Sequence, residues 1–395
     1  MTLNDVCEFI VDCPHSTAKD EGVGYPLIRT PNVGRGRLIL NDVHRVSEAA
    51  YQKRNLRATP QDDDLIMARE APAGNVAIIK NGEKVCLGQR TVLLRPDKTK
   101  VYPDYLAYYL LAPQQQYGLL GTANGATVAH VNIPVIKTLP VSLPSIERQK
   151  KAADILIAYD DLIENNQQQI KLLEEAAQRL YKEWFVDLRY PGHENVPVVD
   201  GVPNGWKKTV FSERVDVLSG GTPKTSNPEY YNGTIPFYSP KDSDDRFYAF
   251  DTETHISESG LENCNSKLYP EGTIIITARG TVGKTTILAI PMAMNQSCYA
   301  LRSSQVSSVF FLFFALRQEI LALKAMANGG VFDTIIVKTF DRINLTTPSA
   351  PVIQAFDKLV TPIMEKMKSL LIENRNLSEA RDRLLPKLMS GEITV

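Results

Sequence analysis

Cationic and amide side chains gather in a few stretches rich in Gly, Pro and Ser, and their types suit contacts with nucleic acid. The stretches are LIRTPNVGRGRL at 27–38, GGTPKTSN at 220–227 and FYSPKDSDDRF at 237–247. Arg can bind a guanine edge through two hydrogen bonds, Asn and Gln can bind adenine, and Lys and Ser can bind phosphates. Each residue alone is better explained as a surface charge, whereas the set favours loops that face nucleic acid.

Further candidates lie in loops that hold matching places in the two halves of the chain. The candidate DNA contacts are Arg29, Asn32, Arg35, Arg37, Arg69, Gln89, Thr222, Lys224, Ser239, Lys241, Arg246, Arg279, Lys284 and Gln296. The net charge of −1 gives no global signature of nucleic-acid binding. Any basic surface must therefore be local.

The stretch ARGTVGKT at 278–285 is similar to a phosphate-binding P-loop. The strict pattern requires Gly at its first position, where Ala278 stands, and a helix after the loop. The residues that follow, TILAIPMAMN, include Pro291 and have a strand-like pattern. We therefore expect a β-turn with Arg279 and Lys284 exposed, and a P-loop nucleotide-binding protein stays as an alternative interpretation.

No motif predicts catalysis, a metal or a cofactor on this chain. No glycine-rich SAM-binding loop follows a strand, and no Asn-Pro-Pro-aromatic tetrapeptide occurs, so a base methyltransferase is not supported. Acidic runs such as residues 62–64 are typical of solvated loops. The five cysteines form no CxxC pair and the five histidines no helix-spaced pair, so we expect neither a zinc site nor a disulfide framework.

Composition and apolar runs indicate a cytoplasmic protein. The N-terminal residues lack the charged and apolar regions of a signal peptide. The most apolar run, Val309 to Leu316, is far too short to span a bilayer. Free cysteines fit a reducing compartment.

A long heptad helix at residues 144–186 is the element that must position the loops. Its seam runs in alternating steps of four and three and contains one polar residue, Asn166. The seam positions are Ala152, Leu156, Tyr159, Ile163, Asn166, Ile170, Leu173, Ala177, Leu180 and Trp184. Such a helix is roughly 60 Å long at about 1.5 Å per residue, and it needs a partner stripe.

The partner is a second copy of the helix, 204 residues later. Adding 204 to each seam position gives another apolar heptad, in which Asn374 and Arg381 are the exceptions. The positions are Phe356, Val360, Ile363, Met367, Leu370, Asn374, Leu377, Arg381, Leu384 and Leu388. The chain is thus an internal repeat of about half its length.

Each helix is preceded by a block with short β-type runs. In the first block, YPLIRT, DLIMAR, NVAIIK and RTVLLR predict strands, and residues 102–111 predict a helix. In the second, GTIIITARGTVGKTTIL takes the place of DLIMAREAPAGNVAII, and Gln296 matches Gln89. We expect an α+β protein with α/β blocks at 1–143 and 207–347, helices at 144–188 and 348–395, and a Pro/Gly-rich linker at 189–206.

Two asparagines predict how the helices pair. Asn166 is the fifth of its seam positions and Asn374 the sixth, so they face each other if the helices are antiparallel and in full register. A buried Asn pair fixes register at some cost in stability. Pro362 predicts either a kink in the second helix or a helix that begins there with Thr361 as its cap.

Four segments resemble those of the specificity subunits of type I restriction–modification enzymes. They are LPSIERQKKAADIL, LLEEAAQRLYKEWFVD, RDRLLPKLMSGEI and the long run from PNGWKK to FYSPKD. The opening DVCEFIVDCPHST departs from the start that this run shows for the second block. The resemblance covers essentially the whole chain.

The resemblance implies two target-recognition domains, separated by antiparallel coiled-coil helices and related by a pseudo-twofold axis. Each domain would read one half of a split double-stranded DNA target, and the helices would set the gap. Methyltransferase subunits would bind around the helices and restriction subunits would join them. SAM, Mg²⁺ and ATP would belong to those partners, and this chain would have no catalysis of its own and no membrane contact. A coiled-coil scaffold without DNA specificity stays as a second interpretation.

Overall fold

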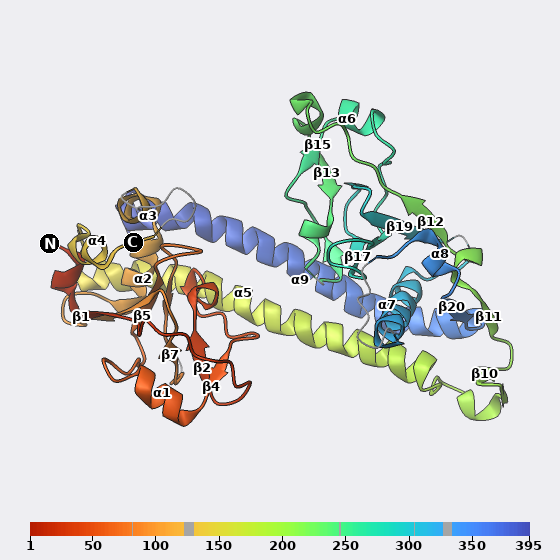
Figure 1. The fold of residues 1–395 in the computed structure, drawn as a ribbon, viewed down its shortest axis with the longest axis horizontal. Helices are drawn as coiled ribbons and strands as arrows, with labels where there is room; N and C mark the ends of the chain where they lie inside the picture. The colour runs from red at the N-terminus through yellow and green to blue at the C-terminus, as the bar shows by residue number, and fades with distance from the viewer. Residues whose placement is uncertain (81, 122–129, 245, 304, 327–333) are drawn as a thin grey trace. The chain divides into compact units, whose positions relative to one another are not determined.

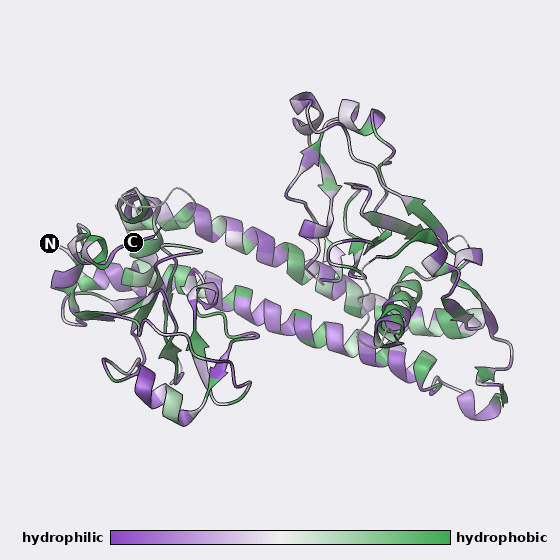
Figure 2. Cartoon of the chain, in the orientation of Figure 1, coloured by the Kyte–Doolittle hydropathy of each residue, from purple (hydrophilic) through white to green (hydrophobic). Residues whose placement is uncertain are grey.

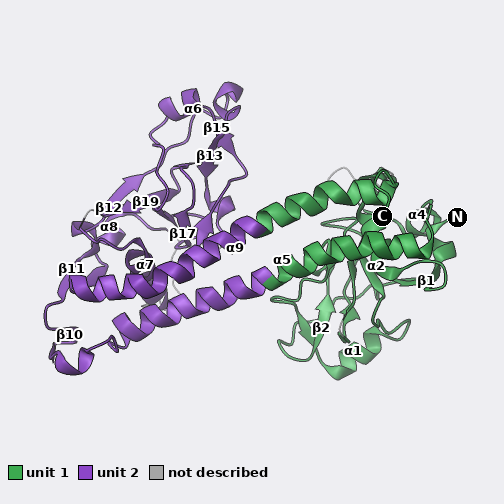
Figure 3. Ribbon diagram, turned by 180° about the vertical axis from the view of Figure 1, so that it is seen from behind, with its two compact units in different colours: residues 1–165, 374–395 green, residues 166–373 purple. Residues whose placement is uncertain are grey.

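The computed structural model describes residues 1–395 apart from residues 81, 122–129, 245, 304 and 327–333 (Figure 1). Its described part forms two compact units (Figure 3). Unit 1 contains residues 1–165 and 374–395, and unit 2 contains residues 166–373. Each long helix therefore contributes one half to each unit.

Unit 1 contains two sheets in its α/β part. The larger has the order β1-β8-β5-β6-β3, in which only β3 and β6 are parallel. Its strands are β1 (Cys7–Asp12), β8 (Thr91–Pro96), β5 (Leu65–Ala68), β6 (Val76–Ile78) and β3 (Gly36–Arg37). The smaller sheet, β4-β2-β7, comprises β4 (Arg45–Val46), β2 (Tyr25–Ile28) and β7 (Cys86–Leu87).

Unit 2 repeats this topology strand for strand. Its sheets have the orders β12-β19-β16-β17-β14 and β15-β13-β18, with the same parallel and antiparallel pairs as in unit 1. The strands are β12 (Asp216–Ser219), β19 (Cys298–Arg302), β16 (Ile274–Thr277), β17 (Thr285–Leu288), β14 (Tyr248–Ala249), β15 (His255–Ile256), β13 (Ile235–Tyr238) and β18 (Ala293–Met294). The predicted internal repeat is confirmed.

The central strands are apolar on both faces because both faces are covered. In β5 and β6 every residue is buried. One side packs in a core with α2 (Pro103–Leu111), and the other packs in a separate core beneath the loops. In unit 2 the apolar helix α7 (Val309–Met326) takes the place of α2.

Shorter elements complete the units. The helices are α1 (Glu48–Arg54), α3 (Pro113–Leu120), α4 (Ile133–Thr138), α6 (Glu258–Glu262) and α8 (Val337–Phe340), and the strands β9 (Val198–Val199), β10 (Val202–Pro203), β11 (Lys207–Val210) and β20 (Asn344–Thr347). β11 pairs with β20, so both ends of the second block meet in one ladder. The stretch expected as a linker holds β9 and β10, and its flanking rings, Tyr190 and Trp206, are buried 5.1 Å apart in the core of unit 2.

The two long helices are α5 (Ile146–Tyr181), which ends in a π-helical turn at Lys182–Val186, and α9 (Ala350–Ser390). Hydrophobic and hydrophilic residues alternate along both (Figure 2). Every seam position predicted from the heptads is buried or half-buried. The heptad period therefore identified the packed stripe of each helix.

The helices are antiparallel within each unit. In unit 1, the Asn374 amide donates to the Ile163 carbonyl at 3.3 Å, and Arg381 bonds Asp160 at 2.6 Å. In unit 2, the rings of Tyr181 and Trp184 lie 6.3 and 6.0 Å from that of Phe356. Late residues of one helix thus meet early residues of the other, as predicted.

Two details of the helices bear on the sequence predictions. α9 runs continuously through Pro362, so the alternative in which a helix begins at Pro362 is wrong. Asn166 is 3% exposed and belongs to unit 2, whereas Asn374 belongs to unit 1, so their pairing stays a prediction.

Candidate nucleic-acid interface

The loops of unit 2 that carry candidate contacts are joined by backbone hydrogen bonds. Asn295 N donates to Tyr238 O at 2.9 Å, and Ala278 N donates to Ser297 O at 2.7 Å. The Thr281 hydroxyl donates to Pro240 O at 3.3 Å. Gly221 N donates to Met294 O at 3.1 Å, next to Asn295. We call the segments joined in this way, residues 220–224, 239–242, 278–284 and 295–297, recognition edge 2.

Unit 1 has the same backbone frame. Gly88 N donates to Ile28 O at 2.7 Å, and Arg69 N donates to Arg90 O at 2.8 Å. The β5–β6 turn of unit 1 and the β16–β17 turn of unit 2 are closed by equivalent hydrogen bonds. Gly74 N donates to Ala68 O, and Gly283 N donates to Thr277 O, each at 2.8 Å. We call residues 29–32, 69–75 and 88–90 recognition edge 1.

This frame assigns equivalent positions without reference to side chains. Gly88 matches Asn295 and Arg90 matches Ser297, so Gln89 and Gln296 between them occupy the same place. Both glutamines are exposed. The sequence match at an offset of 207 therefore corresponds to a structural equivalence.

At recognition edge 2, most candidate side chains remain available to a ligand. Lys224, Lys241 and Arg279 are exposed. Thr222 is exposed and its hydroxyl donates to Gln296 Oε1, which orients that side chain. Donors and acceptors of the kinds that bind phosphates and base edges are thus present on this edge.

Three other candidates of unit 2 have different surroundings. Ser239 caps a short 3₁₀ helix, because its N–H and hydroxyl both donate to Asp242 at 2.8 Å. Arg246 is exposed but forms an ion pair with Asp244. Lys284, expected to be exposed, is half-buried, because it begins the strand side of the hairpin and its N–H donates to Thr277 at 3.1 Å.

In unit 1, three candidate side chains form hydrogen bonds or ion pairs within the protein. Asn32 is 5% exposed, accepts from Arg29 N at 3.2 Å and donates to Ile39 O at 3.1 Å. Arg69 is 8% exposed and bonds both oxygens of Asp12, at 3.0 and 3.1 Å. Arg37 forms an ion pair with Asp161 of α5. These side chains hold loops together, so the expectation that they contact DNA is not supported by their surroundings.

The exposed candidates of unit 1 are Arg35 and Gln89, while Arg29 is half-buried. Sequence reasoning missed Arg90, which follows Gln89 on recognition edge 1. Its side chain is 63% exposed and its Nη1 lies 2.9 Å from Glu70 Oε2. Its backbone has φ +63°, a left-handed conformation that few non-glycine residues adopt.

The P-loop-like stretch is the turn between antiparallel strands β16 and β17. Strand β17, not a helix, directly follows this turn. The turn therefore lacks the helix N-terminus that binds phosphate in a P-loop. The predicted β-turn is confirmed, and the P-loop alternative lacks its structural basis. Among the residues that the structure describes, no cluster of His, Cys, Asp and Glu could hold a metal ion.

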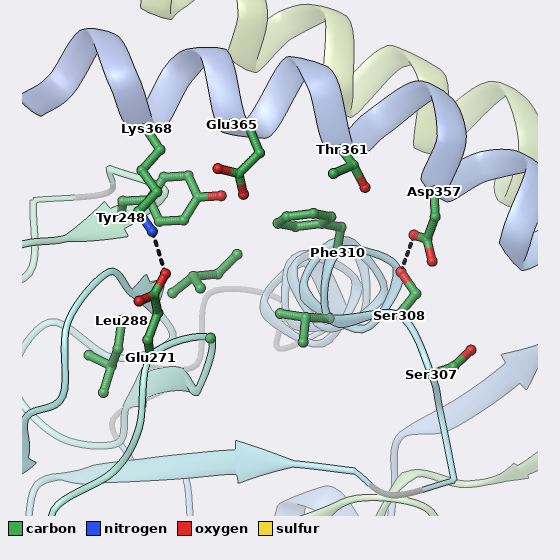
Figure 4. A pocket seen from close by; sticks show the side chains of 13 residues that line it. Tyr248, Glu271, Leu288, Ser307, Ser308, Phe310, Asp357, Thr361, Glu365 and Lys368 are labelled. Atoms are coloured by element: carbon green, nitrogen blue, oxygen red, sulfur yellow. Dashed lines mark hydrogen bonds and ion pairs between the residues drawn. The ribbon is translucent and has the colours of Figure 1, made fainter.

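A pocket of about 280 Å³ lies in unit 2 between α9 and the α/β part (Figure 4). Lys368 of α9 pairs with Glu271, and the Ser308 hydroxyl donates to Asp357 of α9. Burial raises the pKa of Asp357, and the bond from Ser308 offsets part of that rise. The lining contains three carboxylates and one lysine, which disfavours phosphate, so we interpret the pocket as a joint between domain and helix.

The sequence profile of the type I restriction modification DNA specificity domain matches residues 1–175 and 203–377. The chain belongs to this family. Each match contains one of the two blocks together with most of the long helix that follows it. The chain is thus a type I DNA specificity subunit with two recognition domains, and the scaffold and P-loop alternatives are not favoured.

Specificity subunits of known enzymes are similar over most of their length. The HindI specificity subunit of Haemophilus influenzae is 26% identical over 93% of this chain and 94% of its own. The MjaIX specificity subunit of Methanocaldococcus jannaschii is 28% identical over 89% of this chain and 82% of its own.

A solved specificity subunit shares the fold. The S subunit of a type I restriction–modification system from M. genitalium superimposes with a TM-score of 0.58 at 16% identity, over 98% of this chain and 95% of its own. The predicted fold class is therefore confirmed. Among the described residues, no helix is long and apolar enough to cross a membrane.

Proposed function

We propose that recognition edges 1 and 2 each read one half of a split double-stranded DNA target. The observation that carries this proposal is the repeated backbone frame with different side chains on it: Arg90 against Ser297 and Glu70 against Arg279. Base edges specify sequence, and a fixed frame with exchangeable side chains suits two readers of different sequences.

In this proposal the paired helices α5 and α9 set the number of unread base pairs between the half-sites. Methyltransferase subunits dock on the helices, and restriction subunits join that assembly. This chain supplies recognition and no catalysis. SAM, Mg²⁺ and ATP act in the partner subunits. The relatives are named as subunits of restriction enzymes, which supports such an assembly.

The proposal is tested by co-expressing the full chain with its cognate methyltransferase subunit and purifying the complex through a tag on this chain. The complex then selects duplexes from a random pool at a salt concentration that suppresses non-specific binding. We expect co-purification and a selected motif with two specified blocks. A chain that binds no methyltransferase, or a complex that selects no motif, contradicts the proposal.

A further inference from the structure

The two recognition edges share one residue at a fixed place and differ at its neighbours. The bond from Arg69 N to Arg90 O corresponds to that from Ala278 N to Ser297 O. Glu70 and Arg279 therefore hold equivalent places, as do Arg90 and Ser297. Between these divergent positions, Gln89 and Gln296 are identical in type and in backbone setting.

We propose that Arg90 with Glu70, and Arg279 with Ser297, determine which bases the two domains read, whereas Gln89 and Gln296 bind the DNA backbone in both. This inference rests on the proposed function and deepens it. Two domains that read different half-sites must differ where they read bases. The sugar–phosphate backbone is what all half-sites have in common.

The guanidinium of Arg90 is exposed and is held in place by an ion pair. Its guanidinium lies 2.9 Å from Glu70 Oε2, and Glu70 Oε1 lies 2.6 Å from His130 Nδ1. The Glu70 side chain is only 17% exposed, so it acts as a fixed anchor beneath an exposed arginine. An arginine has five N–H donors, and a single ion pair leaves enough of them to bind the O6 and N7 of guanine.

Recognition edge 2 presents another set of groups at the same places. Arg279 replaces the anchoring carboxylate, is exposed, and forms no ion pair with any residue in the described part of the chain. Ser297 replaces the arginine, and its N–H donates to Asn295 Oδ1 at 2.9 Å. The exposed cation therefore lies in the β7–β8 loop on recognition edge 1 and in the β16–β17 turn on recognition edge 2, so the two edges present different patterns of donors and acceptors.

The glutamines differ from these positions because their residue type and backbone setting are the same in both domains. Both are exposed and follow equivalent short strands, β7 and β18. Thr222 further orients Gln296 through a hydrogen bond. A side-chain amide at an identical place serves a contact common to both half-sites, and such contacts fix register without specifying sequence.

The test maps methylated adenines genome-wide in cells that express the full chain with its cognate methyltransferase subunit. The variants are Arg90→Ser, Arg279→Glu, Gln89→Ala and Gln296→Ala, and Lys53→Ser is the control, an exposed cation of α1 outside the edge. Co-purification and thermal melting of each complex show that the variants are folded. Because all five positions are exposed, we expect unchanged melting.

Arg90→Ser is expected to alter or relax bases in one half-site only and to lower methylation of the wild-type motif about tenfold or more. Arg279→Glu is expected to do so in the other half-site. Both glutamine variants should keep the motif and lower the methylated fraction. An unchanged motif with Arg90→Ser and Arg279→Glu, or a changed base with Gln89→Ala, overturns this inference alone. A wild-type chain that yields no split motif overturns the proposed function and this inference together.

Discussion

Arg381 of α9 and Asp160 of α5 form a buried ion pair in unit 1, with Nη1 and Oδ1 2.6 Å apart. The side chains are 16% and 4% exposed. The other carboxylate oxygen, Oδ2, accepts from the Tyr108 hydroxyl of α2 at 2.6 Å. Burial alone lowers the pKa of Arg381, but Asp160 and Asp382 reverse that effect and raise it. Asp160 therefore joins both helices and the first domain.

The internal repeat lacks this pair in its second copy. The offset of 204 relates Asp160 to Met364 and Arg381 to Ala177. Met364 and Ala177 are both 0% exposed and lie in the core of unit 2. The helix contact is thus polar at this position in unit 1 and apolar at the equivalent position in unit 2.

Arg381→Ala is expected to destabilise the chain by about 3–5 kcal/mol, because it leaves the Asp160 carboxylate buried without its cation. The double variant Asp160→Met with Arg381→Ala copies the apolar pairing of unit 2 and should regain most of that loss. Tyr108 loses an acceptor in it, which leaves a residual cost of about 1–3 kcal/mol. Urea unfolding of the three proteins measures these differences. Equal stability of Arg381→Ala and the original chain would show that the pair is not buried as described.

Arg69→Met tests whether a candidate residue is structural. Arg69 bonds Asp12, the Val131 carbonyl at 2.8 Å and His130 at 2.8 Å, so its loss should cost about 3 kcal/mol in unfolding free energy. The exposed Arg35 serves as the matched control, and Arg35→Met should stay within about 0.5 kcal/mol. Thermal and urea unfolding decide between the roles. A stable Arg69→Met protein with weakened DNA binding would return Arg69 to the list of DNA contacts.

Inserting one heptad into both helices tests the spacer. The insertions follow Gln168 in α5 and Ser369 in α9, which keeps the pairing set by Ile163 and Asn374. Seven residues add roughly 10 Å, or about three base pairs, so the gap between half-sites should grow by about that number. Motif selection with the purified complex measures the gap. An insertion in α5 alone should disturb pairing and lower stability, and an unchanged gap with both insertions would refute the spacer role.

The raised pKa of Asp357 predicts a pH dependence of stability. A carboxyl whose pKa is higher in the folded state than in the unfolded state contributes stability at low pH that is lost as the pH rises through the folded value. From about pH 4 upward, near the ordinary Asp value of 3.8, Asp357→Asn should therefore become progressively more stable than the original chain.

Ser308→Ala provides the opposite test at the same site. The Ser308 hydroxyl lowers the pKa of Asp357 and also accepts from Phe311 N at 3.0 Å at the start of α7. Its removal should cost about 1 kcal/mol at low pH through the lost helix cap. The cost should grow as the pH rises, because the pKa of Asp357 is then raised further. Unfolding free energies between pH 4 and 7 measure both variants. A flat difference between Asp357→Asn and the original chain would contradict the assigned shift.

Periodicity was sufficient to predict the helices and the repeat, because each seam position is a local property of the sequence. The antiparallel pairing was predicted from the places of Asn166 and Asn374 on the two seams. The roles of Asn32 and Arg69 were not predictable, since their partners, Ile39 and Val131, come from other loops. Arg90 was missed because the sequence signals neither its exposure nor its left-handed backbone.

The sequence identified Arg381 as a polar exception in the heptad, but it did not predict Asp160 as its partner. Asp160 lies next to the seam residue Tyr159 and becomes buried only where α2 covers it. The sequence therefore located the polar position on one helix and could not supply the contact that satisfies it. Contacts that join three elements depend on the tertiary fold.

The most direct measurement of the central claim is a genome-wide map of methylated adenines in cells that express this chain with its cognate methyltransferase subunit. The account predicts one motif with two specified blocks separated by a fixed number of unspecified base pairs. A continuous motif, a variable gap, or methylation that does not depend on this chain would contradict it.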